Sequence, residues 1–448
     1  MATFNFTNSM VGAGAMGLGG AIAASGGFIS LISIIFLAVL SKVSLDMLVE
    51  LTTIFCAKGM NTYEDLGQVA FGNWGRTSVL VLKAMYAFGC KVAYIVVVRD
   101  NLADGLEHLI FPGGSSRWLS ENHVLITFLL CTFIVLPMCF LREMQSLATV
   151  SLCSVASMMM IVCIIVYLFI FSTDESHSFD SRDVYDNWIE VRYGFLESLG
   201  TFVFTFVSQH TVHLAFNSIK TKDRNLKNWK LVSLFSISMA CFVSLTIGFV
   251  VYMTFGKETR SDIFEMYSPS RAISMAKVFL SLNMLLTCPL VFLTCREMVI
   301  VLLKMIWMKR ETCNDLQEAL IPMDERKRVL SASLEEDEHS LIEVKRNLIW
   351  PCLLPGSDKN LRLPYHAFLT ILLWSLITAA ALLSPSLGDV LDLVGSFSGT
   401  GIAFILPGLF SIKLRGGYSH KAAFVTIVGG AIGLVGTYFS TKKFLNDL

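Results

Sequence analysis

Three glycines near the start of the chain have a spacing that could support chemistry. They are Gly12, Gly14 and Gly17, which form the pattern G-x-G-x-x-G. In a nucleotide-binding protein this pattern holds a pyrophosphate, but it follows a β-strand and opens an amphipathic helix, with an acidic residue about 20 positions further on. Here only a few residues precede Gly12, and the apolar sequence that follows has no carboxylate before Asp46. The spacing therefore does not indicate a dinucleotide site.

A different role for the same glycines follows from their place inside an apolar segment long enough to span a membrane. Glycine lowers the cost of leaving the helical conformation, and unwound backbone at membrane depth is tolerated only where it lines a cavity. We therefore expect the first span to unwind around a bound solute. Close packing of helices through small residues would give the same composition and stays open as the alternative.

The composition places the chain among multi-pass membrane proteins. Of its 448 residues, 54% are hydrophobic and 16% are charged, against about 25% charged in a typical soluble protein. The formal net charge is zero, so nothing indicates a nucleic-acid partner. No CxxC pair or His/Cys cluster indicates a metal site, and we expect no cofactor other than a candidate Na+. We also expect no cleavable signal peptide, because no basic segment precedes the first apolar run.

The apolar segments predict the helices that position these glycines. A span needs about 20 apolar residues. By this rule we expect about eleven transmembrane helices, at residues 5–24, 27–54, 77–99, 123–141, 147–171, 194–217, 231–255, 271–307, 365–384, 388–412 and 421–440.

The charges of the loops predict the orientation of these spans. Lysine and arginine gather at residues 220–230 and 413–421, whereas residues 174–190 are acidic, so the N-terminus is expected in the cytosol. The long charged connection 308–364 is then cytosolic, and its polarity predicts disorder or an exposed helix. Its residues 337–342 fit an acidic dileucine pattern, which makes this loop a candidate contact for a sorting or signalling partner.

Five ordered blocks then resemble a known family, and together they cover nearly the whole chain. They resemble the amino acid/auxin permease family, especially its sodium-coupled neutral amino acid transporter branch (solute carrier family 38-like). The blocks are Asn8–Gly14, Tyr63–Leu66 with Ala70–Gly72, Phe204–His210, Leu286–Pro289 with Thr294–Glu297, and Val394–Ser396 with Phe404–Leu409.

The resemblance implies an all-α fold of the leucine-transporter type, with a single transmembrane domain over residues 1–448. Two inverted repeats of five spans, about 5–171 and 194–412, would be followed by one extra helix at about 421–440. The first and sixth spans would be broken and would face each other. Half-helix N-termini would then hold the substrate's carboxylate, and exposed carbonyls would hold a coupling cation.

The resemblance also implies site residues. The substrate would contact Gly12, Ala13 and Gly14 in the first span and Ser208, Gln209 and His210 in the sixth. A sodium ion would bind the side chains of Asn8 and Thr287 and the backbone near Val11. The structural alternatives are a helix cap for Asn8, a bond from Thr287 to its own helix, and hydrogen bonds between helices for the polar residues of the sixth span.

Two further observations bear on the site. Lys91 and Glu197 are charged residues within spans, which makes them functional candidates, either as an ion pair or as a group that responds to protons. The structural alternative for Glu197 is that its side chain snorkels to the membrane interface. Gly19 and Gly20 stand where many relatives have Pro-Tyr, and Ser208-Gln209 replaces the usual Cys-His. These departures leave the size of the substrate open.

The sequence thus predicts a transporter that is not an enzyme. We expect secondary active transport of neutral amino acids, coupled to sodium or protons, by alternating access in a lipid bilayer. The alternative is an amino-acid sensor that signals through its cytosolic loop, while a channel is disfavoured because no ring of charges lines any span. With no glycosylation sequon and no cysteine pair in the outer loops, a vacuolar or lysosomal membrane is favoured over the plasma membrane.

Overall fold

Helices make up all the regular secondary structure that the computed structural model describes, and no strand occurs among the described residues. The prediction of an all-α fold is confirmed. The described residues are 6–10, 12–56, 62–111, 118–142, 147–171, 188–319, 361, 363–416 and 419–447.

The order of the elements follows the expected spans closely. Helices labelled η are π-helices at η1, η7 and η8, and 3-10 helices elsewhere. The elements are α2 (Ala13–Ser25), α3 (Gly27–Phe55), α4 (Tyr63–Ile110), α5 (Trp118–Glu121), α6 (His123–Leu130), η1 (Cys131–Val135), α7 (Leu136–Cys139), α8 (Leu147–Phe171), α10 (Gly194–Glu197), α11 (Leu199–Phe204), η3 (Gln209–Thr211), α12 (Val212–Asn217), η4 (Thr221–Asp223), α13 (Leu226–Phe255), η5 (Gly256–Glu258), η6 (Ile263–Glu265), α14 (Arg271–Ala319), α17 (Leu363–Leu383), α18 (Leu387–Val394), η7 (Gly395–Gly399), η8 (Gly401–Ile405), α19 (Leu406–Leu414) and α20 (His420–Asp447).

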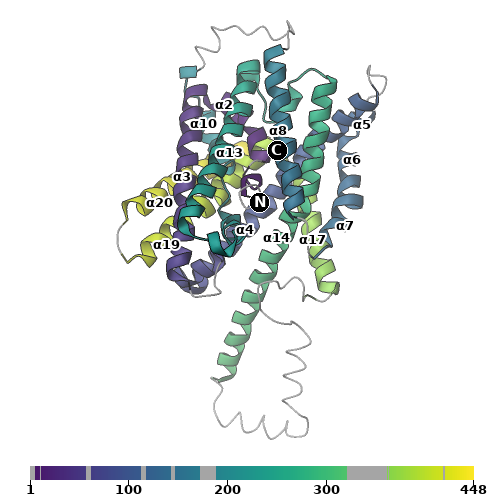
Figure 1. Cartoon of the computed structure of the whole chain (residues 1–448). Helices are drawn as coiled ribbons and strands as arrows, with labels where there is room; N and C mark the ends of the chain where they lie inside the picture. Colours follow the sequence, from purple (N-terminus) through teal and green to yellow (C-terminus); the bar gives the residue numbers. More distant parts are fainter. Residues whose placement is uncertain are drawn as a thin grey trace.

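The helices form one bundle whose long members run roughly parallel in Figure 1. Within the described part of the chain, 8 helices are long and apolar enough to cross a membrane, and residues 13–25 and 123–139 form shorter apolar helices. Large apolar side chains are exposed on the outside of the bundle, where a bilayer would cover them. The chain is therefore a multi-pass membrane protein, and the count of eleven spans stays a prediction.

Helix α4 begins at Tyr63, well before the span expected at 77–99. The side chain of Thr62 accepts a hydrogen bond from the backbone of Asp65, and the Asp65 carboxylate accepts one from the backbone of Thr62 (3.1 and 3.2 Å). This capping box starts a helix at Tyr63. The helix then bends at Phe71 and Gly72, where Gly72 has a φ of 62°.

Helix α14 is also longer than the span expected at 271–307. It continues to Ala319 and projects below the bundle in Figure 1. The first part of the charged connection 308–364 is therefore helical. The dileucine pattern at 337–342 lies outside the described residues.

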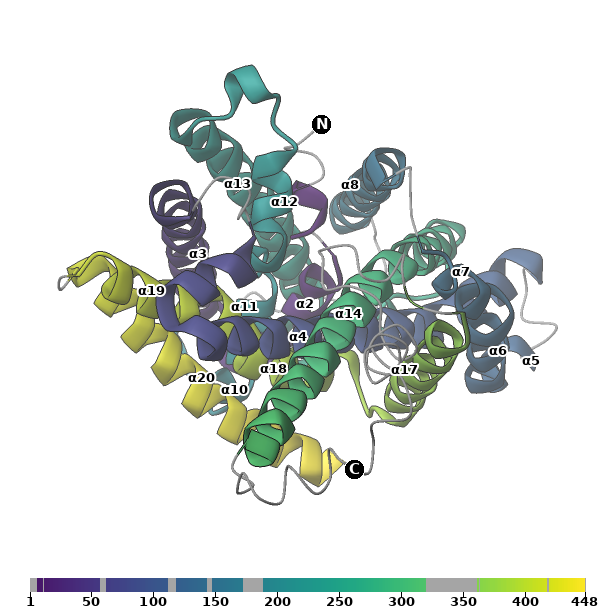
Figure 2. The ribbon, with the colours of Figure 1, turned by 90° about the horizontal axis from the view of Figure 1, so that it is seen from below.

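Helices α2, α11 and α4 lie at the centre of the bundle in the view of Figure 2. Helices α3, α13, α19 and α20 lie on one side of them, and α5 to α8 and α17 lie on the other. Helix α14 packs along α4. The two spans expected to be broken are therefore enclosed by the rest of the bundle.

Helix α11 packs against the tenth span without space for a side chain between the two backbones. A methyl group at Gly200 would overlap the backbone of Asp392, and one at Gly395 would overlap the carbonyl of Gly200. The Asp392 carboxylate also accepts hydrogen bonds from the backbone N–H and the hydroxyl of Thr201 (3.0 and 2.6 Å). Glycine is required at positions 200 and 395 because any Cβ would separate the helices.

Candidate functional site

The first span is broken at the glycine segment. Residues 6–10 form a short helical turn that ends at Met10, and α2 begins at Ala13. Gly12 lies between them with φ −156° and ψ −140°, and no side chain caps the first turn of α2. The first backbone N–H groups of α2 have no partner within their own helix, so the half-helix presents its positive end to the break. The expectation that this span unwinds is confirmed.

The sixth span is broken as well. Helix α11 ends at Phe204, Ser208 has the non-helical angles φ −136° and ψ 6°, and α12 begins only at Val212. Gln209 favours this break because its side chain competes with the helix for a backbone hydrogen bond. The side-chain oxygen of Gln209 accepts a bond from the backbone N–H of Ser208 at 2.9 Å.

The two breaks are in contact with each other. A methyl group at Gly14 would lie 3.0 Å from Cα of Thr205 and 3.1 Å from Cδ1 of Phe204. On the side of the breaks that is expected to face the cytosol, the Thr211 hydroxyl donates to the Ser9 hydroxyl at 3.2 Å. Gly14 therefore allows the backbones to approach, and a solute held at one break would touch the other.

Two buried polar atoms of the sixth-span break have no hydrogen-bond partner among the described residues. They are Oγ of Ser208 and Nδ1 of His210. Gln209, in contrast, is fully engaged, because its Nε2 donates to the Ser41 hydroxyl at 3.0 Å, and that hydroxyl donates to the carbonyl of Phe206 at 2.8 Å. Ser208 and His210 are therefore free to bind a ligand, whereas Gln209 holds the break against α3.

Two tyrosines of α4, which no sequence motif singled out, form an aromatic wall. The hydroxyl of Tyr86 donates to the carbonyl of Val207 at 3.4 Å, and its ring lies 5.0 Å from that of His210. The Tyr94 hydroxyl would lie 3.7 Å from a Cβ at Gly12. Because the two tyrosines are eight residues apart on one helix, they share a face, and this spacing was a usable signal. They bound the space beside both breaks.

The three residues predicted for sodium stay a prediction. Asn8 is half-buried, and its side chain bonds to no other described residue. The hydroxyl of Thr287 donates to the carbonyls of Asn283 and Met284 in its own helix, at 2.9 and 3.2 Å. Val11 lies outside the described residues.

Lys91 does not pair with Glu197, so that interpretation was wrong. The Lys91 ammonium is fully buried, donates to Sγ of Cys139 at 3.1 Å and lies 3.8 Å from the centre of the Phe292 ring. Glu197 lies on α10, where its carbonyl accepts a bond from Ser440 at 3.2 Å. Lys91 thus points toward α7 and α14. The sequence could not show this, because it does not fix the rotation of a buried helix.

Buried polar contacts lie on the side of the bundle that is expected to face the cytosol, and we call them the cytosolic network. They occur within α4, between α3 and α12, and between α4 and η8. The Lys83 ammonium lies 2.5 Å from the Glu64 carboxylate across the bend of α4. The Thr52 hydroxyl lies 2.7 Å from Nε2 of His213, and the Tyr63 hydroxyl donates to the carbonyl of Ile402 at 2.9 Å. These bonds hold the cytosolic half of the bundle together beneath the breaks.

On the opposite side, which we call the outer side because α2 and α13 end there, the bundle contains a polar cavity of about 400 Å³. Its walls come from the outer ends of α2, α4, α18 and α20 and from the loop 256–270 between α13 and α14. Charged side chains line it, among them Asp392 and Lys443, whose oxygen and nitrogen are 3.5 Å apart.

Two broken helices that enclose free polar groups within a membrane bundle define a solute transporter, in which half-helix ends bind the cargo. Comparison with known proteins agrees with this class. Residues 1–440 match the family described as transmembrane amino acid transporter protein, so the chain belongs to this family. The resemblance read from the five sequence blocks is confirmed, as is the expectation that the protein is a transporter and not an enzyme.

Individual relatives share about a quarter of their residues with the chain. Vacuolar amino acid transporter 5 of Saccharomyces cerevisiae is 26% identical over 74% of this chain and 71% of its own length. Putative sodium-coupled neutral amino acid transporter 11 of Danio rerio is 24% identical over 97% of this chain and 84% of its own length. A crystal structure of a manganese transporter mutant from Eremococcus coleocola matches with a TM-score of 0.49 and 12% identity, over 100% of this chain and 87% of that one.

Proposed function

We propose that the chain is a secondary active transporter of neutral amino acids that works by alternating access in a vacuolar or lysosomal membrane. The observation that carries the proposal is the contact between the two broken spans, with free polar atoms on Ser208 and His210 beside it. Membership of the amino acid transporter family supports the cargo. The names of the vacuolar relatives support the membrane.

The groups around the breaks suit a zwitterion. The N–H groups at the start of α2 would bind the substrate's carboxylate, since anions are favoured at a helix N-terminus. The carbonyls freed at the sixth-span break would accept bonds from its ammonium group. The rings of Tyr86 and Tyr94 would then border its side chain, and such a wall favours an uncharged side chain over a charged one.

Coupling to a cation is part of the proposal. Transport against a gradient requires that substrate and cation together stabilise a state that neither stabilises enough alone. Asn8 and Thr287 offer an amide and a hydroxyl oxygen for sodium, and protons are the alternative. Alternating access would then open the outer cavity and the cytosolic network around Glu64 and Lys83 in turn.

The test is uptake into proteoliposomes of purified protein, with a panel of radiolabelled neutral amino acids and with sodium and pH gradients imposed separately. Wild-type protein should accumulate at least one of them under one gradient. The variant Gly14→Val should abolish uptake, because its side chain would collide with the backbone of Thr205. Gly430→Val is the matched control, since a Cβ at Gly430 meets no atom within 4 Å.

Two outcomes would contradict the proposal. If no amino acid of the panel is accumulated under either gradient, the chain is not the transporter proposed here. If an amino acid binds saturably to the purified protein but is never carried, the sensor alternative would replace transport.

A further inference from the structure

The outer loop between α13 and α14 packs directly on the two glycines that depart from the family pattern. A methyl group at Gly20 would lie 2.7 Å from the backbone nitrogen of Ser261, and one at Gly19 would lie 3.0 Å from Cγ2 of Ile263. A methyl group at Gly388, at the start of α18, would overlap the Ser261 hydroxyl. Residues 259–265 therefore close over the outer half of α2, and small residues on two helices make room for them.

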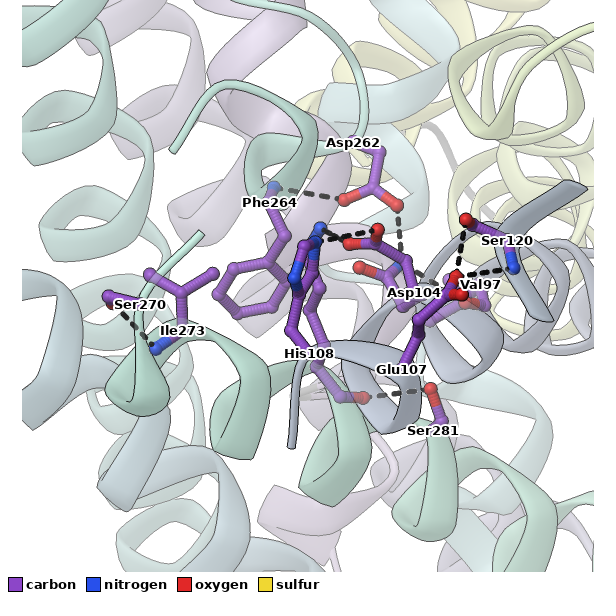
Figure 3. Close-up of polar contacts among 12 residues, drawn as sticks. Val97, Asp104, Glu107, His108, Ser120, Asp262, Phe264, Ser270, Ile273 and Ser281 are labelled. Atoms are coloured by element: carbon purple, nitrogen blue, oxygen red, sulfur yellow. Dashed lines mark hydrogen bonds and ion pairs between the residues drawn. The ribbon is translucent and has the colours of Figure 1, made fainter. Parts of the chain in front are cut away.

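Asp262 is the buried residue that fastens this loop. Its side chain is enclosed, with the residue only 6% exposed. One carboxylate oxygen accepts a bond from the backbone N–H of Phe264 at 3.0 Å, and the other accepts a bond from the side-chain amide of Asn101 on α4. The same amide also donates to the carbonyl of Val97 at 3.0 Å. Figure 3 shows Asp262 held in this way between the loop and α4.

Among the residues that the structure describes, no cation compensates the charge of Asp262. Among the described residues none forms an ion pair with it, because the nearby cations are engaged elsewhere. The guanidinium of Arg99 lies 2.6 Å from the carboxylate of Asp100. Lys277 lies 2.5 Å from Asp104, which also lies 3.4 Å from His108. A carboxylate enclosed without a cation is costly to keep ionised.

The remaining charges around Asp262 make ionisation harder. Burial, followed by repulsion from the negative charges of Asp100 on α4 and Glu265 in the loop, raises the pKa of Asp262 to about 7. A carboxylate has about four acceptor positions, and only two are used, so a proton fits without breaking either bond. The other ionisable groups on the elements around Asp262 and its cavity are Arg99, Asp104, Glu107 and His108 on α4, Lys257, Glu258 and Arg260 in the loop, Lys277 on α14, Asp389 and Asp392 on α18 and Lys443 on α20.

A proton can reach Asp262 from the outer side. Asp262 is part of the wall of the polar cavity of about 400 Å³, and a cavity of that size lined by charged groups is large enough for water. The site is thus connected to outer water while its carboxylate stays enclosed.

We propose that Asp262 is a proton-binding site of the outer side, and that the proton bound there stabilises the loop 256–270 in its closed position on α2. This inference rests on the proposed function for its role in a transport cycle. When the loop lifts, Asp262 meets water and loses its proton at pH values well above its ordinary pKa of 3.8. Closure is then favoured by acid, because the closed state binds the proton more tightly than the open state.

The size of the pH effect on loop closure follows from the difference between the pKa of Asp262 in the closed loop and its pKa in the open loop. Between pH 8 and pH 5.5, a group with a pKa of about 7 in the closed state and 3.8 in the open state should change the ratio of closed to open loop by about 30-fold. Acid should therefore close the outer side of the protein, whatever the substrate.

Hydrogen–deuterium exchange of the purified protein measures this without a substrate. After correction for the intrinsic effect of pH on amide exchange, exchange in residues 256–270 should be about 30-fold slower at pH 5.5 than at pH 8. In Asp262→Asn, which imitates the neutral acid, this dependence should disappear. Glu258→Gln is the matched control, since Glu258 is an exposed acid of the same loop, and it should keep the wild-type response.

A second variant keeps the test decisive if Asp262→Asn does not fold. Asp100→Asn removes a repelling charge, so the midpoint of the wild-type response should move toward acid pH, a shift that a merely structural role would not cause. An unchanged pH response in either variant, or a pH-independent loop in the wild type, would overturn the assignment. Failure of the amino-acid uptake assay would leave this result untouched, so the two proposals fail separately.

Discussion

The contact between Gly20 and the outer loop gives the sharpest prediction, because its three nearest atoms all belong to backbone. In Gly20→Ala the new methyl group would lie 2.7, 2.8 and 2.9 Å from Ser261 N, Ser261 Cα and the carbonyl carbon of Arg260. Ordinary contacts between carbon atoms are about 3.5–4.0 Å. The loop must therefore move away from α2 by roughly 0.7 Å, and backbone cannot rotate aside as a side chain does.

The expected effect is a loop that opens more often. Overpacking of this kind costs about 1–3 kcal/mol, and this corresponds to a change of roughly 5- to 150-fold in a two-state equilibrium. Hydrogen–deuterium exchange in residues 256–270 should rise by that factor in Gly20→Ala, since exchange reports local opening.

The control for this experiment is Gly430→Ala. Both substitutions place alanine in a helix, where it is favoured over glycine by about 1 kcal/mol, but a Cβ at Gly430 meets nothing within 4 Å. Exchange of the loop should be unchanged in the control. If Gly20→Ala also leaves the loop at the wild-type rate, the loop does not close on α2 in solution and the reasoning is refuted.

Two further predictions concern the cytosolic network and the candidate cation site. Lys83→Met should lower the free energy of unfolding by about 3–5 kcal/mol, because it leaves the buried Glu64 carboxylate unpaired. Adding Glu64→Gln to this variant should restore most of the lost stability. Thermal melting in detergent measures both effects, and equal melting temperatures for Lys83→Met and the wild type would refute the prediction. Asn8→Ala should raise the sodium concentration needed for half-maximal uptake by 10-fold or more while pH-driven uptake stays unchanged, and unaltered sodium dependence would remove Asn8 from the site.

Much of the fold could be predicted because the signals are local. Membrane spans follow from the length of apolar runs, and the two breaks follow from glycine at 12 and 14 and from the polar island at 208–210. The early start of α4 was also readable, since Thr62 and Asp65 have capping-box spacing. It was missed because the apolar run begins later than the helix.

Other features depend on tertiary contacts that no local pattern encodes. The segment around Asp262 has the composition of a hydrated outer loop, yet Asp262 is buried because the loop folds back on Gly19 and Gly20. Likewise, Lys91 and Glu197 are both charged residues within spans, and only the rotation of their helices shows that they face different neighbours. Gly19 and Gly20, which stand where many relatives have Pro-Tyr, are the surface on which this loop closes.

The packing of Gly200 against Asp392 and Gly395 has a mechanical consequence. Two helices that meet backbone to backbone cannot slide or tilt independently, since neither has a side chain that can yield. The outer half of the sixth span and the start of the tenth therefore travel as one piece. In the proposed alternating-access cycle, bending would be taken up at residues 205–208, where the chain is already out of helical conformation. The proposed substrate site would then also be the hinge of the protein.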